Sequence, residues 1–90
     1  MILAELPMRW QLVVDRDGRP GLYHPGWGPR ALSCVADQPL TVRRLLVRVG
    51  AWLTVAEKHY RPDDKVLRAA RWARMQLEIY AAHHAQFNAP

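Results

Sequence analysis

The clearest hydrophobic pattern in the chain runs through residues 62–87. Side chains suited to a buried face recur there at alternating spacings of four and three, which keeps them on one helical stripe: Val66, Ala70, Ala73, Leu77, Tyr80, His84 and Phe87. A second row lies beside the first and consists of Trp72, Met75, Ile79 and Ala82. Charged side chains take most of the remaining circumference: Lys65, Arg68, Arg71, Arg74 and Glu78. The pattern predicts one amphipathic helix whose apolar side is too wide for a single partner surface.

An earlier helix is predicted from residue 42 to about residue 59. Its apolar positions also repeat at intervals of three and four: Val42, Leu45, Leu46, Val49, Leu53, Ala56 and Tyr60. Thr41 is the expected N-cap, because it follows a break at Asp37-Gln38-Pro39. Gly50 in the middle costs roughly 1 kcal/mol relative to Ala, and it indicates either close helix packing or a bend.

The connection between the two predicted helices is short. It reads Tyr60-Arg61-Pro62-Asp63-Asp64. Pro62 suits the first helical position, and the two aspartates suit the positive end of the helix that follows. A short connection makes consecutive helices neighbours, so we expect residues 41–60 and 62–87 to form an antiparallel helical hairpin.

The N-terminal part of the chain has the alternation of short strands. Residues 1–7 are interpreted as a lead-in that ends at Pro7, and residues 9–15 as a strand with Trp10, Leu12 and Val14 on one face. Asp17-Gly18 favours a tight turn, because glycine tolerates a positive φ. A return strand over residues 21–24 follows, with Pro20 at its start or on a sheet edge because proline donates no backbone hydrogen bond.

Two further segments precede the helices. Residues 24–29, His-Pro-Gly-Trp-Gly-Pro, predict an irregular loop whose Trp27 either covers the core or is presented as a binding anchor. Residues 30–36 are compatible with a third strand or with a short helix.

The predicted fold class is therefore α+β. A small N-terminal antiparallel β-hairpin or meander, within residues 1–37, packs on the C-terminal antiparallel helical hairpin. Ninety residues, half of them apolar, are expected to form a single domain, residues 1–90, with one modest core.

Charge is distributed unevenly along the chain. Residues 1–37 hold four Arg and four acids, whereas residues 38–90 hold seven Arg, two Lys and four acids. The whole net charge of +5 therefore belongs to the helical half. A basic surface attracts nucleic acid, an anionic membrane or an acidic protein face, although charge alone can also be a solvated helix surface.

The sequence offers little catalytic or metal-binding chemistry. His83 and His84 point about 100° apart on a helix, and no His-x-x-x-His or Cys-x-x-Cys pair is present. Cys34 lies among small apolar residues, where an inert thiol is more common than a nucleophile. Gly26-Trp27-Gly28 lacks the further residues of a phosphate-binding loop. We predict that the protein is not an enzyme and uses no cofactor or metal.

Localisation follows from the same features. One cysteine permits no internal disulfide, so a reducing, cytoplasmic setting is the simplest interpretation. The first residues lack the basic and apolar regions of a signal peptide. No apolar stretch approaches the roughly 20 residues that cross a bilayer.

The favoured function is binding. The hypothesis is a small basic module, regulatory or inhibitory, that docks on a larger acidic or nucleic-acid-handling protein. The predicted partner-binding residues are Arg68, Arg71, Arg74, Arg44, Arg48, Trp27 and Trp72. The alternative is direct DNA or RNA binding by the same arginines, with a strong dependence on salt. Self-association through the C-terminal helix is a further interpretation, although Ala70 and Ala73 favour close packing over a strong zipper. Attachment of the basic helix to a membrane surface is another.

Overall fold

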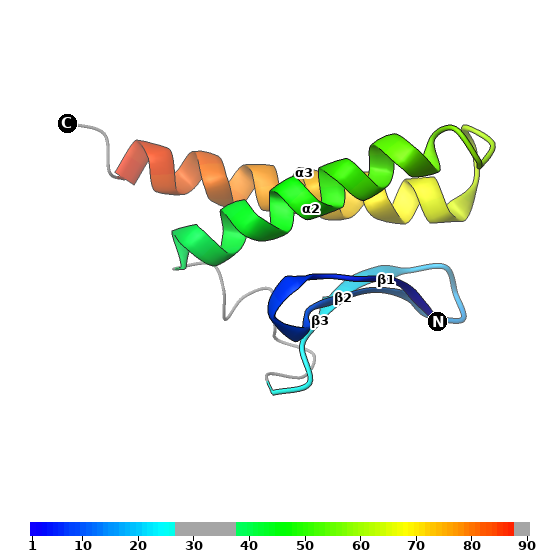
Figure 1. The fold of residues 1–90 in the computed structure, drawn as a ribbon, viewed down its shortest axis with the longest axis horizontal. Helices are drawn as coiled ribbons and strands as arrows, with labels where there is room; N and C mark the ends of the chain where they lie inside the picture. The colour runs from blue at the N-terminus through cyan, green and yellow to red at the C-terminus, as the bar shows by residue number, and fades with distance from the viewer. Residues whose placement is uncertain (27–37, 88–90) are drawn as a thin grey trace.

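The computed structural model of the chain describes residues 1–26 and 38–87. Its elements follow in the order β1 (Ile2–Glu5), η1 (Pro7–Arg9), β2 (Gln11–Val14), β3 (Pro20–Tyr23), α2 (Pro39–Ala56) and α3 (Lys65–Phe87). The strands form one antiparallel sheet, and the two helices form an antiparallel hairpin that lies along one face of this sheet (Figure 1). The predicted α+β class and the packing of a sheet on a helical hairpin are confirmed.

The β2–β3 hairpin closes as its sequence predicts. Leu12 pairs with Leu22, Val13 with Gly21 and Val14 with Pro20, which stands at the start of its strand. The Asp15 carboxylate accepts hydrogen bonds from the backbone N–H groups of Asp17 and Arg19, each at 2.9 Å. Gly18 adopts a φ of +79°, which only glycine takes without strain. An Asp side chain and a Gly backbone together fix the turn.

The first residues form a strand and not a lead-in, so that prediction was wrong. β1 pairs with β2 through Ile2 and Val13, Ala4 and Leu12, and Glu5 and Gln11. The register shifts between Ile2 and Ala4, which is the signature of a β-bulge. A bulge interrupts the period of two on which strand recognition depends, and this is why the apolar run at residues 2–4 gives no clear strand signal.

The core lies between the inner face of the sheet and both helices. Trp10, Leu12 and Val14 are buried, so the predicted inward face of β2 is confirmed. α3 contacts both β2 and β3 as well as α2, whereas α2 contacts α3 and η1. α3 is thus the element that joins the two halves of the fold. Its buried positions include Val66, Ala70, Ala73 and Leu77 from the predicted stripe, with Leu67 and Ala69 beside them. The side chains of His84 and Phe87 lie outside the described part.

The start of α2 differs from its prediction. The helix begins at Pro39, and the residue at the N-cap is Gln38, whose side chain makes no capping hydrogen bond. Thr41 lies within the first turn and donates its hydroxyl to the Gln38 side-chain oxygen at 3.2 Å. Proline fits the first helical position because its missing N–H would be unpaired there anyway. The helix ends at Ala56, earlier than the predicted residue 59.

α3 begins at Lys65, three residues after the predicted start at Pro62. Asp64 explains the difference, because its carboxylate accepts a hydrogen bond from the backbone N–H of Val66 at 2.8 Å. An N-cap aspartate pairs one of the orphan donors of the first turn, which Pro62 cannot do. Pro62 therefore belongs to the connection between the helices.

Gly50 lies inside a continuous α2 helix. A Cβ built at this position has no heavy atom within 4 Å apart from its own helix neighbourhood. Close packing therefore does not require glycine here, and the helix runs through it without a break.

The predictions for Trp27, Cys34 and the strand at residues 30–36 lie outside the described residues. Within the described part, neither helix has a stretch both long and apolar enough to cross a membrane.

Candidate binding surfaces

The second apolar row of α3 lies on the surface. Met75 is 50% exposed and Ile79 is 55% exposed, while Trp72 is half-buried and Ala82 is exposed. We call Trp72, Met75, Ile79 and Ala82 the α3 apolar row. The opposite side of the same helix is fully packed, since Ala70, Ala73 and Leu77 have no accessible surface. The excess of apolar side chains predicted for this helix is therefore present in the structure.

The arginines beside this row are exposed or half-buried, and two of them have acidic neighbours. One Arg71 nitrogen donates to the backbone oxygen of Pro62 at 3.0 Å, and the other lies 3.7 Å from a Glu57 carboxylate oxygen. Arg74 lies 3.7 Å from Glu78, one turn further along the helix. Pairs as exposed as these contribute roughly 0–1 kcal/mol, so they hold these arginines only weakly. Arg68 is exposed at the start of the row.

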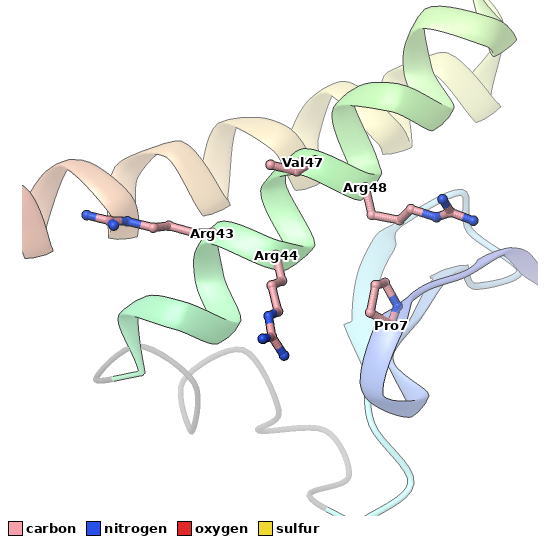
Figure 2. A pocket seen from close by; sticks show the side chains of 5 residues that line it. All are labelled: Pro7, Arg43, Arg44, Val47 and Arg48. Atoms are coloured by element: carbon pink, nitrogen blue, oxygen red, sulfur yellow. The ribbon is translucent and has the colours of Figure 1, made fainter.

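A different group of arginines surrounds a hollow on α2. The hollow has a volume of about 330 Å³ and is lined by Pro7, Arg43, Arg44, Val47 and Arg48. Figure 2 shows the three guanidinium groups directed away from one another around Val47, with Pro7 on the facing segment. Val47 is 73% exposed. Arg44 makes one long contact, 4.0 Å, with the Met8 sulfur. Among residues 1–26 and 38–83, no acid lies within salt-bridge distance of these three arginines.

The predicted arginines consequently lie at two places. Arg44 and Arg48 border the hollow next to η1, whereas Arg68, Arg71 and Arg74 belong to α3. Arg71 lies level with Glu57 through their ion pair. Glu57 is nine residues along from Arg48, which corresponds to roughly 13 Å of helix axis. Trp72 lies with the α3 group, and Trp27 is outside the described residues.

A second hollow adjoins the first and was missed by sequence reasoning. It has a volume of about 480 Å³ and lies between residues 3–6 and four residues of α2, namely Arg48, Ala51, Trp52 and Val55. Arg48 lines both hollows. The spacing of Ala51 and Val55, which with Val47 places apolar side chains on the outer face of α2 at intervals of four, indicates the helical side of this hollow. It gives no signal for the facing residues 3–6.

The described part of the chain includes the side chains of three of the four histidines, His24, His59 and His83. No group of three or more His, Cys, Asp or Glu side chains is positioned there to hold a metal ion. His24 has a structural role: one ring nitrogen lies 3.1 Å from the Met8 carbonyl oxygen, and the other accepts from the Gly26 N–H at 3.0 Å. Its ring also meets the buried Trp10 ring edge-on, at a centroid distance of 5.3 Å.

Comparison of the chain with models of protein families, with curated proteins and with solved structures gave no match.

Proposed function

We propose that the protein is a non-catalytic binding module that docks on a protein partner through the outer face of α3. The observation that carries this proposal is the α3 apolar row, with Met75 and Ile79 half exposed on a helix whose other side is already filled. Exposed apolar rows edged by charge are typical of protein interfaces. The partner surface would present apolar side chains edged by carboxylates, to match Arg68, Arg71 and Arg74.

The free energy that burial of Met75 and Ile79 would contribute to binding is consistent with this role. Full burial of a Met or Ile side chain is worth about 1.5–3 kcal/mol, and roughly half of that is still available to each of these residues. Charge complementarity adds mainly to the association rate and to partner choice. A small module of this kind would act as a regulator or inhibitor of a larger cytoplasmic protein, for example one that handles nucleic acid and presents an acidic surface.

Direct DNA or RNA binding is the alternative function. Phosphate contact requires cations on the surface, which α2 and α3 both supply, but it has no use for the α3 apolar row. Fluorescence anisotropy of labelled DNA and RNA across a salt series separates the two functions. Tight binding that falls steeply with salt would favour nucleic acid, and its absence at low salt would favour a protein partner.

The experiment that tests the proposal compares three forms of the protein in partner capture from cell extract. The test variant is M75D/I79D, and the matched control is L40D/Y60D, which adds the same two charges at exposed apolar positions away from the α3 row. We expect the captured protein to be lost from the test variant and retained by the wild type and the control.

Retention of the same partner by the M75D/I79D variant would contradict the proposal. Sedimentation of each form distinguishes self-association: if the row joins two copies, the wild type sediments as a dimer and the test variant as a monomer.

A further inference from the structure

The outer face of α2 carries a second surface that does not depend on the α3 apolar row. The two hollows on this helix share Arg48 and together extend from Arg43 to Val55. We call these two neighbouring hollows together the α2 groove. Twelve residues of helix correspond to about 18 Å of axis. An extended peptide of five or six residues has the same length at about 3.3 Å per residue.

One wall of the α2 groove is an edge strand. β1 is at the edge of the described sheet, and the second hollow is lined by four consecutive residues, 3–6. Successive side chains of a strand point to opposite faces, so four in a row can line one hollow only if the backbone itself borders it. Ala4 and Leu6 are indeed turned to the core. Edge strands in general can bind an extended segment through backbone hydrogen bonds.

The groove is chemically different at its two ends. Arg43, Arg44 and Arg48 surround one end, and none of them has an acidic partner in the described part of the chain. Trp52, Val55 and Leu3 line the other end. Glu5 also borders that end, and its carboxylate accepts a hydrogen bond from the Gln11 side chain at 3.3 Å. An occupant therefore needs negative charge at the first end and apolar side chains at the second.

We propose that the α2 groove binds an extended acidic peptide segment of a partner protein. Its Asp or Glu side chains lie over Arg43, Arg44 and Arg48, and the apolar side chains that accompany them lie over Trp52 and Val55. Phosphates gain nothing from the apolar part of the groove, and its aromatic residue, Trp52, is half-buried, which limits stacking of a base on it; a peptide is therefore favoured over a nucleic acid. The Glu5 carboxylate at the same end would repel a continuous polyanion.

A displayed library of random 12-residue peptides, selected on the immobilised full chain, tests this proposal. We expect the enriched peptides to share two or more acidic residues followed within a few positions by apolar ones. The affinity of an enriched peptide for the wild type is then compared, by fluorescence anisotropy, with its affinity for R43E/R44E/R48E and for W52A. We expect the dissociation constant to rise at least about tenfold for the triple variant, because like charges would then face each other.

The matched control is R16E/R19E/R61E. It changes the formal net charge from +5 to −1 just as the test variant does, but at exposed positions away from the α2 groove. Equal weakening by test and control variants would show a non-specific charge effect and would overturn the proposal. So would the absence of enriched peptides, enrichment without acidic residues, or loss of binding in M75D/I79D with full binding by R43E/R44E/R48E. The peptide experiment tests only the α2 groove. The function proposed for the α3 apolar row is tested separately, by partner capture with M75D/I79D.

Discussion

α2 and α3 pack against each other with different side chains on their inner faces. α2 buries mainly large aliphatic residues, namely Val42, Leu45, Val49 and Leu53 with Ala56, whereas α3 buries three alanines, Ala69, Ala70 and Ala73, among Val66, Leu67 and Leu77. α3 also contacts β2 and β3, whereas α2 makes far fewer contacts with these strands. Small side chains let a helix approach two neighbours at once. The buried alanines of α3 therefore allow its central position between α2 and the sheet. The larger buried residues of α2 fit its more peripheral position.

The outer faces of the same helices differ as well. α3 presents an apolar row beside arginines that are partly engaged with Glu57 and Glu78. α2 presents three arginines around the exposed Val47. The first arrangement suits a broad apolar contact, and the second suits a narrow acidic one. Two surfaces on one small chain imply that each has to be tested with its own variants.

The largest stability effect is expected from the inner face of α2. Leu53→Ala removes a fully packed side chain and should lower the free energy of unfolding by about 2–5 kcal/mol. Val47→Ala, on the outer face of the same helix, should change it by less than about 0.5 kcal/mol. Urea unfolding followed by circular dichroism measures both. Equal effects of the two substitutions would break the assignment of inner and outer faces.

The second effect concerns the alanines of α3. Ala73→Leu inserts a large side chain where no accessible surface remains and should cost about 1–3 kcal/mol through overpacking. Ala82→Leu is the matched control, because Ala82 is exposed on the same helix. Thermal unfolding of both variants decides the matter. A neutral Ala73→Leu would mean that close approach of α3 to its neighbours does not depend on its small residues.

The helix starts give a third, smaller contrast. Asp64→Ala removes the N-cap hydrogen bond to Val66 and should cost about 0.5–2 kcal/mol. Gln38→Asp supplies a capping side chain that α2 lacks, and a gain of up to about 1 kcal/mol is expected. Chemical unfolding of each variant, with the double variant to check additivity, provides the measurement. A gain on removing Asp64 would disprove its capping role.

The smallest expected effect is a gain in stability on substitution of Gly50. Gly50→Ala should stabilise α2 by up to about 1 kcal/mol, because the added methyl group meets open space and alanine favours the helix. The melting temperature records this change. A loss would indicate that the position is constrained by something other than packing.

Regular periodicity is what allowed the fold to be predicted. The helical hairpin, the inward face of Trp10, Leu12 and Val14, and the turn at Gly18 all follow from local spacing and turn chemistry. β1 was missed because its bulge breaks the period of two, and Thr41 and Pro62 were misplaced because several residues near each helix start can serve as caps.

The surfaces were less predictable than the core. The spacing of Met75 and Ile79 revealed an excess of apolar residues on α3, but only the packing showed which row stays exposed. Helical spacing gives the direction of each arginine on its own helix, and it does not show which element lies opposite. Trp52 is an i,i+4 neighbour of Arg48 on α2, but Pro7 and Leu3 became neighbours of Arg48 through tertiary contacts that no local pattern contains.

Strand order in the sheet follows chain order, and the two helices also follow one another directly. The β2–β3 loop and the α2–α3 connection are both short, and loops of about ten residues close in roughly 10–100 ns. β-hairpins form in roughly 1–10 μs, so we expect both hairpins to sample their native shape before α3, which begins at Lys65, docks on β3, which ends at Tyr23. We expect this docking step to set the folding rate. In stopped-flow experiments, Ala73→Leu should then lower the folding rate. Asp64→Ala should leave the folding rate nearly unchanged.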